Sequence, residues 1–594
     1  MTINERISKL RLLMEEKDID VYLVPSDDYH QSEYVGDYFK ARAYITGFTG
    51  SAGTAIITKN SAGLWTDGRY FIQAENELKE TEVALFKMGE PNVPTIDEYL
   101  DKVLPENGTL GFDGRVVSYA DGKKYKELFS YKNVTIQDRY DLIDLIWTER
   151  PALSTEPVFA LDEKYSGESV SSKLKRLRTA MSEKHATCHI LITLDDIAWL
   201  LNLRGKDVAY TPVFLSYAVI KMDCVHLFMD ENKLSADITQ DLTDNNIILH
   251  PYNDVYEFVA SLSTDESVLF DPARINYALY NRIPTSIKCI EGTNPCILFK
   301  SMKNDVEIEN TRIAHIKDAI AHTKFMHWVK TRYDKEEITE SSASDKLEAF
   351  RAEQENFLWP SFGPISAFGE HAAMCHYSSS EETNVVLKEG ALFLTDTGGN
   401  YLEGSTDITR TIALGEISDE LKFHFTSVLR GNLALANATF LHGCTGENLD
   451  ILARQYLWNS SLDYKHGTGH GVGYLLSIHE GPCNIRWQHK ADSSILEKGM
   501  VLSDEPGIYI EGSHGIRLEN ELVVREGTKN EYGQFMYFEV LTFVPFDLDA
   551  IDPTLLRQDE KEQLNAYHKK IYEIVSPHMT DEEKIWLQHY TRAI

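Results

Sequence analysis

The sequence is poor in basic residues. Lys and Arg together number 59 against 92 Asp and Glu, which gives a formal net charge of −33. Nucleic acids and anionic membrane surfaces are bound through a surplus of Lys and Arg. We therefore expect neither nucleic acid nor membrane as a partner, and we assign the acidity to solubility.

The sequence also lacks the segments that target a chain to a membrane. The stretch after Met1 has no basic region followed by an apolar one, so we expect no signal peptide. No apolar run approaches the length needed to span a bilayer. The seven cysteines are scattered without a Cys-x-x-Cys pair, which is typical of reduced cytosolic thiols. These absences predict a cytoplasmic protein.

What is present is a chain of 594 residues, long enough for three or four domains. Near the N-terminus Ile7, Leu10 and Leu13 recur every three residues, which predicts an amphipathic helix. Apolar strands are predicted at 21–25 and 54–57. This alternation of helix and strand predicts an α/β domain over residues 1–155.

A second segment, residues 156–304, repeats the same order. An amphipathic helix is followed by a strand at 189–193 and a helix at 195–201. The repetition indicates a duplication, although the identity between the halves is too low to establish it. The charged stretch at 300–305 marks the next boundary.

Residues 305–543 are expected to form an α+β domain, and residues 544–594 a helical tail packed on it. A long helix with Ile313, Ile316 and Ile320 on one face opens the domain, and strands with Gly-rich turns follow. The tail has apolar residues at helical spacing: Leu564, Tyr567, Ile571 and Ile574.

Two pairs of acidic residues in this third domain are candidate metal ligands. Asp396 ends an apolar strand, and Asp407 follows eleven residues later, so a hairpin can bring them together. Glu505 and Glu519 are separated by fourteen residues, again a hairpin distance. With His470 they form a mostly oxygen ligand set, which suits two divalent ions better than one tetrahedral zinc.

Glycine occupies every second position at residues 466–473, where the sequence is HGTGHGVG and begins with His466, and another histidine opens HEGP at 479–482. Glycine is favoured where the backbone must approach another group closely. The alternative interpretation is a surface loop with incidental histidines. Because His466, His470 and His479 fall together with so many glycines, we favour an active site.

The blocks that carry these residues resemble the pita-bread metallopeptidases, and most closely their long, three-domain Xaa-Pro aminopeptidases. The resemblance rests on HGTGHGVG, HEGP and SDEPG at 503–507. It extends to GFTGSAGTAII at 47–57, WTDGRY at 65–70 and DIAWLLNLRG at 196–205. It implies two creatinase-like α/β domains, a pita-bread catalytic domain and a helical C-terminal tail.

The resemblance also implies roles for individual residues. Two metal ions would be bridged by Asp407 and Glu519, with Asp396 completing one site and His470 and Glu505 the other. Glu505 would take the proton from the attacking water. The remaining implied residues are substrate-binding or catalytic: Arg69, His376, His466, His479 and Arg517, of which His376 and His479 would stabilise the oxyanion or protonate the leaving nitrogen.

The family habit and the oxygen-rich ligands predict Mn²⁺, with Co²⁺ or Zn²⁺ as alternatives. The expected reaction removes an N-terminal residue that precedes proline, and a homodimer is expected by resemblance. Two alternatives remain open at this point. One is a prolidase that cleaves only Xaa-Pro dipeptides, and the other is a pita-bread binding module without catalysis.

Overall fold

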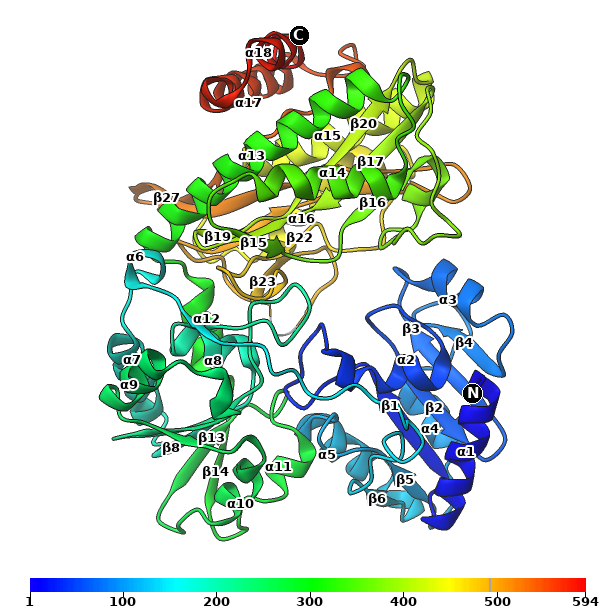
Figure 1. Ribbon diagram of the computed structural model, residues 1–594, viewed down its shortest axis with the longest axis vertical. Coiled ribbons are helices and arrows are strands. Elements are labelled where there is room, and N and C mark those ends of the chain that lie inside the picture. Colours follow the sequence, from blue (N-terminus) through cyan, green and yellow to red (C-terminus); the bar gives the residue numbers. More distant parts are fainter. Residues whose placement is uncertain (491–492) are drawn as a thin grey trace. The chain divides into compact units, whose positions relative to one another are not determined.

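The computed structural model of the protein describes residues 1–490 and 493–594 (Figure 1). The chain divides into two compact units. The first contains residues 1–161 and 168–296, and the second contains residues 162–167 and 297–594.

The first unit opens with a six-stranded mixed sheet of order β4-β3-β2-β1-β5-β6. The central strand β1 pairs antiparallel with β2 and parallel with β5. The outer pairs β3–β4 and β5–β6 are parallel. The strands are β1 (Val21–Pro25), β2 (Thr54–Thr58), β3 (Ala62–Thr66), β4 (Val83–Lys87), β5 (Thr109–Gly111) and β6 (Thr135–Gln137).

A second six-stranded sheet in this unit repeats the topology, with the order β12-β11-β10-β8-β13-β14. Its central strand β8 pairs antiparallel with β10 and parallel with β13, as β1 does with β2 and β5. The repeated order supports the duplication inferred from sequence. The strands are β8 (Cys188–Leu191), β10 (Tyr217–Lys221), β11 (Val225–Phe228), β12 (Ile247–His250), β13 (Ser267–Phe270) and β14 (Lys288–Glu291).

Equivalent segments of the two halves also pair with each other. Ser118 and Asn276 form an isolated antiparallel bridge, and each caps the N-terminus of the helix that follows it. The helices are α5 (Tyr119–Leu128) and α11 (Tyr277–Tyr280). The Tyr119 N–H donates to Ile275 O and the Tyr277 N–H to Val117 O, both at 2.8 Å. This reciprocal pairing is the pattern that a pseudo-twofold arrangement produces.

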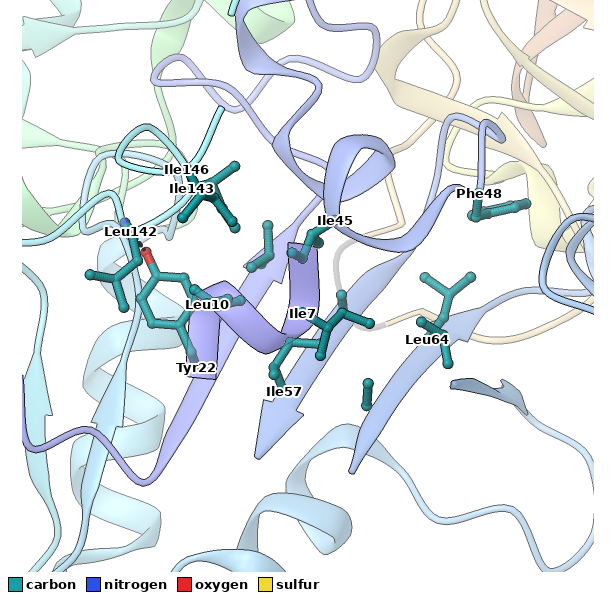
Figure 2. Close-up of a cluster of buried hydrophobic side chains, with 14 of the residues drawn as sticks. Ile7, Leu10, Tyr22, Ile45, Phe48, Ile57, Leu64, Leu142, Ile143 and Ile146 are labelled. Carbon is teal, nitrogen blue, oxygen red and sulfur yellow. Dashed lines mark hydrogen bonds between the residues drawn. The ribbon is translucent and has the colours of Figure 1, made fainter. Parts of the chain in front are cut away.

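Helix α1 (Ile3–Glu16) covers the first sheet and begins at a capping box formed by Thr2 and Glu5. Figure 2 shows Ile7 and Leu10 of α1 in the same cluster as Tyr22 of β1 and Ile57 of β2. The third fully buried position of α1 is Met14, whereas Leu13 is only partly buried. A period of 3.6 residues brings position 14 over position 7, which a strict spacing of three misses.

The second unit is built from short antiparallel sheets with helices packed against them. The sheet β16-β17-β20 and the six-stranded sheet β21-β28-β27-β24-β22-β23 carry the candidate ligands. The strands of these sheets that carry no candidate ligand are β16 (Ile365–Phe368), β21 (Thr439–Leu441), β23 (Glu480–Ile485) and β28 (Gly533–Val540). Strands that carry or border ligands are β17 (Ala391–Thr397), β20 (Ile408–Leu414), β22 (Gly469–Gly471), β24 (Val501–Asp504), β25 (Gly507–Ile510), β26 (His514–Arg517) and β27 (Asn520–Asn530).

Helix α13 (Asp305–Arg332) packs against α14 (Glu340–Ala352) and buries a polar row rather than a purely apolar one. Ile320 is buried, but Ile313 is 37% exposed. The row along the buried face is polar: Thr311, His315, Asp318 and His322. The isoleucines of α13 therefore mark only one edge of its packed surface.

The C-terminal helices are α17 (Gln558–Val575) and α18 (Asp581–Tyr590). Leu564 and Ile571 of α17 are fully buried, and both belong to cores that also contain strand residues of the second unit. The described residues of the tail therefore pack within that unit.

Candidate metal centre

Two strand pairs bring the four candidate carboxylates to one place. In the β17–β20 ladder Asp396 lies opposite Thr409, and Asp407 immediately precedes β20. In the β24–β27 ladder Asp504 lies opposite Asn520, so the neighbouring Glu505 and Glu519 leave the ladder at the same end. Both hairpin relations predicted from the spacing are present.

Thr409 joins the two strand pairs. Its carbonyl accepts the Glu519 N–H at 3.1 Å, and its hydroxyl donates to Glu519 Oε2 at 2.7 Å. The same hydroxyl accepts from Arg517 Nε at 3.2 Å. Asp407 is fixed from its backbone, because its N–H donates to Glu521 Oε1 at 2.8 Å. Carboxylates from separate hairpins are thus held in one cluster.

His470 on β22 completes this cluster. Its Nε2 lies 3.5 Å from Asp407 Oδ2 and 3.6 Å from Glu505 Oε1. One ligand atom each of Asp407, His470 and Glu519 lie within 4.8 Å of one another. His470 Nδ1 lies 2.9 Å from Gly471 O, and because a carbonyl only accepts, Nδ1 carries the proton there. Neutral His470 then presents the lone pair of Nε2 to a metal.

The glycines around His470 permit this close packing. A Cβ on Gly469 would lie 2.0 Å from Ser503 O, and one on Gly471 would lie 2.1 Å from Glu480 O. Backbone atoms cannot yield at such distances, so a side chain at either position would displace a neighbouring strand. The placement of glycine at every second position therefore has a steric reason.

The electrostatics of the cluster favour a cation. Burial, together with nearby Asp407 and Asp396, raises the pKa of Glu505 to about 7. Burial lowers the pKa of His470, but the carboxylates of Asp407 and Glu505 outweigh it and raise that pKa to about 9. Burial and neighbouring carboxylates also raise the pKa values of Asp396 and Glu519. Like charges this close resist joint ionisation unless positive charge is added.

The hydrogen bonding of Asp396 shows whether the cluster has room for a metal ligand bond. One oxygen, Oδ2, accepts a hydrogen bond from Arg517 Nη2. The other, Oδ1, is buried and has no hydrogen-bond partner among residues 1–490 and 493–594. A buried carboxylate oxygen without a donor is costly. With imidazole and carboxylate donors around it, this residue set fits hard divalent ions.

The predicted substrate-binding residues of the second unit border the cluster. The ring of His479 is edge-on to that of His470, with centroids 4.3 Å apart. Arg517 Nη2 lies 3.5 Å from the carbonyl of Cys375, the residue before His376, and His376 itself is half-buried. His466 Nε2 lies 2.8 Å from the hydroxyl of Tyr509.

Tyr509 is a site residue that the sequence did not identify. Its hydroxyl accepts from Arg517 Nη1 at 2.7 Å and contacts His466, so it connects two predicted pocket residues. Tyr509 lies on β25, four residues after Glu505. In the sequence, the signal that could have identified Tyr509 is its place in the strand that begins two residues after Glu505.

Arg69 lies in the first unit, in the turn after β3. Its Nε and Nη2 atoms each donate to a carboxylate oxygen of Asp67 at 2.8 Å. This local ion pair is what an Asp-Gly-Arg turn provides by itself. The assignment of Arg69 to substrate binding stays a prediction.

Family models match the chain along its length. The creatinase/prolidase N-terminal domain matches residues 6–146, and a second model of that description matches residues 149–307. Metallopeptidase family M24 matches residues 309–526, and the C-terminal region of peptidase M24 matches residues 534–594. A probable Xaa-Pro aminopeptidase P of Neurospora crassa is 39% identical, over 96% of this chain and 86% of its own length.

The chain belongs to the Xaa-Pro aminopeptidase P family. Aminopeptidase P1 of Arabidopsis thaliana is 36% identical over all of this chain and 99% of its own. The crystal structure of X-prolyl aminopeptidase from Caenorhabditis elegans, described as a cytosolic enzyme with a di-nuclear active site, matches with a TM-score of 0.96. It has 34% identity over 100% of both chains. An Xaa-Pro dipeptidase of Bacillus anthracis matches with a TM-score of 0.51 and 26% identity, over 64% of this chain and 99% of its own.

Membership of this family confirms the predicted fold class: two creatinase-like domains, an M24 pita-bread domain and a C-terminal region. As an M24 metallopeptidase related to aminopeptidases, the protein is a metalloaminopeptidase and thus a hydrolase. In the part of the chain that the structure describes, no helix is long and apolar enough to cross a membrane.

Proposed function

We propose that this protein is an Xaa-Pro aminopeptidase that hydrolyses the bond between an N-terminal residue and a following proline. The observation that carries the proposal is the cluster of Asp407, His470 and Glu519 with His479 beside it. The relatives named for this activity span nearly the whole chain, which favours the aminopeptidase over a dipeptidase.

Two divalent ions are proposed to occupy the centre, with Mn²⁺ expected first and Co²⁺ or Zn²⁺ as alternatives. Asp407 and Glu519 would bridge them, Asp396 would complete one site, and His470 and Glu505 the other. Four carboxylates carry −4, which two divalent ions neutralise. The di-nuclear active site of the Caenorhabditis elegans enzyme supports this number of ions.

Bound metal would polarise the scissile carbonyl and lower the pKa of the attacking water. Glu505, half-buried at the edge of the cluster, is placed to take that water's proton, and burial keeps its pKa near neutrality. His479, packed against His470, and His376 would stabilise the oxyanion or protonate the leaving nitrogen. Neutral imidazole can donate or accept a proton at physiological pH.

The proline ring is proposed to bind near His466, Tyr509 and Arg517. An Xaa-Pro bond has no N–H, so the pocket must recognise ring shape rather than a backbone donor. Arg517 is 3% exposed and already holds Asp396 and Tyr509. Its contribution to substrate binding would then be to fix the pocket wall. Arg69 is kept as a further substrate-binding candidate from the first unit.

The competing function is a prolidase, which would cleave only Xaa-Pro dipeptides. Metal-stripped protein reloaded with Mn²⁺ should be assayed on Xaa-Pro-Yaa tripeptides and on the matching dipeptides. Release of the first residue from the tripeptides supports the aminopeptidase. Cleavage of dipeptides alone would overturn it, and absence of cleavage in both would favour the binding module.

We further propose a cytoplasmic homodimer with domain limits at 1–155, 156–304, 305–543 and 544–594. The family models support the first two limits, since adjacent models end and begin at residues 146 and 149 and at residues 307 and 309. The M24 model ends at residue 526 and the model of its C-terminal region begins at residue 534, before the proposed limit at 543. The homodimer is proposed on resemblance to the family alone. Light scattering coupled to size-exclusion chromatography tests the dimer, and a monomer mass would refute it.

A further inference from the structure

Arg410 is a buried cation that the reaction itself does not require. It lies on β20, three residues after Asp407, and its side chain is fully buried. Burial lowers the pKa of its guanidinium. A buried cation is normally compensated by a carboxylate, because desolvation of an unpaired charge is expensive.

Every hydrogen-bond acceptor of Arg410 in residues 1–490 and 493–594 is a neutral oxygen. Nη1 donates to the carbonyl of Thr409, at 2.8 Å, and to that of Glu519. The other donors reach Asn520, at the start of β27, and segments that follow this strand. Those contacts are Nε to Pro545 O at 3.2 Å, and Nη2 to Asn520 Oδ1 at 2.8 Å, Val544 O at 2.7 Å and Tyr567 OH at 3.1 Å.

The geometry makes Arg410 a connector between the metal ligands and the C-terminal extension. On one side it binds the carbonyl of Glu519, a proposed bridging ligand, and that of Thr409, whose hydroxyl bonds the Glu519 carboxylate. On the other side it binds Val544 and Tyr567, and Tyr567 belongs to α17. The planar fork of a guanidinium can hold several acceptors at fixed angles, which an ammonium cannot.

Tyr567 contacts both Arg410 and Asn520. Its hydroxyl lies 3.1 Å from Asn520 Oδ1, 3.0 Å from Thr542 O and 2.9 Å from Val544 O. It can donate to one of these while accepting from Arg410. Asn520 follows Glu519 directly, so Tyr567 and Arg410 meet on the residue next to the ligand. Outer contacts of this kind orient metal ligands and commonly change metal affinity about 10–100-fold.

We propose that the C-terminal extension is a working part of the metal centre, with Arg410 and Tyr567 as positioning residues that fix Glu519. This inference rests on the proposed two-metal centre. It predicts that a change in α17, outside the ligand set, weakens metal binding without unfolding the protein.

The test is Tyr567→Phe in the full chain, with Tyr590→Phe as its matched control. Tyr590 lies on α18, and its hydroxyl donates to Asp549 Oδ2 at 2.7 Å, away from the ligand residues. Isothermal titration of the metal-stripped proteins with MnCl₂ gives affinity. The visible spectrum of the Co²⁺-loaded proteins reports ligand geometry, and the melting temperature of the stripped proteins reports stability.

Tyr567→Phe is expected to weaken Mn²⁺ binding about tenfold and to alter the Co²⁺ spectrum. Tyr590→Phe should stay within about twofold of wild type in Mn²⁺ affinity. Arg410→Lys keeps the positive charge but loses the planar set of guanidinium donors, and should weaken Mn²⁺ binding about 100-fold. If Arg410→Lys does not fold, the tyrosine pair still decides the question.

Wild-type affinity and an unchanged Co²⁺ spectrum in Tyr567→Phe would overturn the inference, as would equal weakening in both tyrosine variants. These results leave the proposed function standing. If stripped wild-type protein binds no Mn²⁺, the metal centre itself is refuted, and this inference with it.

Discussion

One buried carboxylate of the first unit and the carboxylate cluster of the second are compensated in different ways. In the first unit Asp207 is matched by one cation, since Lys233 Nζ lies 2.5 Å from its Oδ2 and both side chains are almost fully buried. In the second unit Asp396, Asp407 and Glu519 are 8%, 4% and 1% exposed. Arg517 forms an ion pair with Asp396, and His470 Nε2 lies 3.5 Å from Asp407, so these carboxylates outnumber the arginine and lysine side chains paired with them in the described residues.

The difference separates structural from functional use of charge. In a one-to-one buried pair the protein itself supplies the opposite charge, and removing one partner destabilises the fold. A surplus of carboxylates is incomplete without added positive charge, and perturbed pKa values collect where it occurs. We therefore expect the chemistry at the carboxylate cluster of the second unit, and variants of the two groups should lose different properties.

The largest expected effect is on activity. Glu505→Gln removes the proposed base and should reduce kcat about 10³-fold, because an amide cannot accept the proton. Steady-state cleavage of an Xaa-Pro-Yaa peptide measures it, with circular dichroism to confirm an intact fold. Glu526→Gln, on the exposed part of β27, is the control and should keep wild-type kcat. An active Glu505→Gln enzyme would exclude Glu505 as the base.

Breaking the one-to-one pair should affect stability instead. Lys233→Met leaves Asp207 buried without its cation and should cost about 3–5 kcal/mol of unfolding free energy. Lys59→Met breaks an exposed pair with Asp20 and should cost less than about 1 kcal/mol. Denaturant unfolding compares the two. Equal losses would mean that burial does not distinguish these pairs.

Metal binding should release protons from the second unit. In metal-free protein the pKa of His470 is about 9 and that of Glu505 about 7, so at pH 7 the first is protonated and the second about half protonated. Metal ligands bind deprotonated, so Mn²⁺ affinity should rise with pH up to about 9, the raised pKa of His470. Calorimetry in buffers of different ionisation enthalpy should detect about one to two protons released at pH 7.

In the Glu505→Gln variant the number of released protons should fall, because His470 is then the main proton donor. Binding without proton release at pH 7 would contradict the raised pKa values.

The smallest effect concerns the duplicated sheets. Ser118 Oγ accepts the Asp121 N–H at 3.1 Å and caps α5, so Ser118→Ala should cost about 1 kcal/mol of stability. Ser8→Ala, within α1, should cost nothing because alanine favours helix. Thermal unfolding measures both, and Mn²⁺ affinity should be unchanged in each. If Ser118→Ala lost Mn²⁺ affinity, the stability of the first unit would influence metal binding in the second, contrary to this prediction.

Much of the candidate site could be predicted from the sequence because its residues come in local blocks. The spacing of Asp396 to Asp407 and of Glu505 to Glu519 anticipated two hairpins, and both ladders exist. Their assignment as ligands stays a proposal that the metal titrations test. The apolar face expected for α13 was only partly right, since that helix buries a polar row. Within this row His315 lies 3.0 Å from Glu521, a residue far along the chain.

The sequence by itself determined the class of chemistry, because oxygen-rich ligands and histidines among glycines are visible in short stretches. Only the tertiary structure decided which of these groups are compensated. Tyr509 joins His466 to Arg517, and Arg410 reaches Tyr567, 157 residues further along. Such contacts follow no local period, because hydrogen bonds between distant segments form only once the sheets and helices have packed.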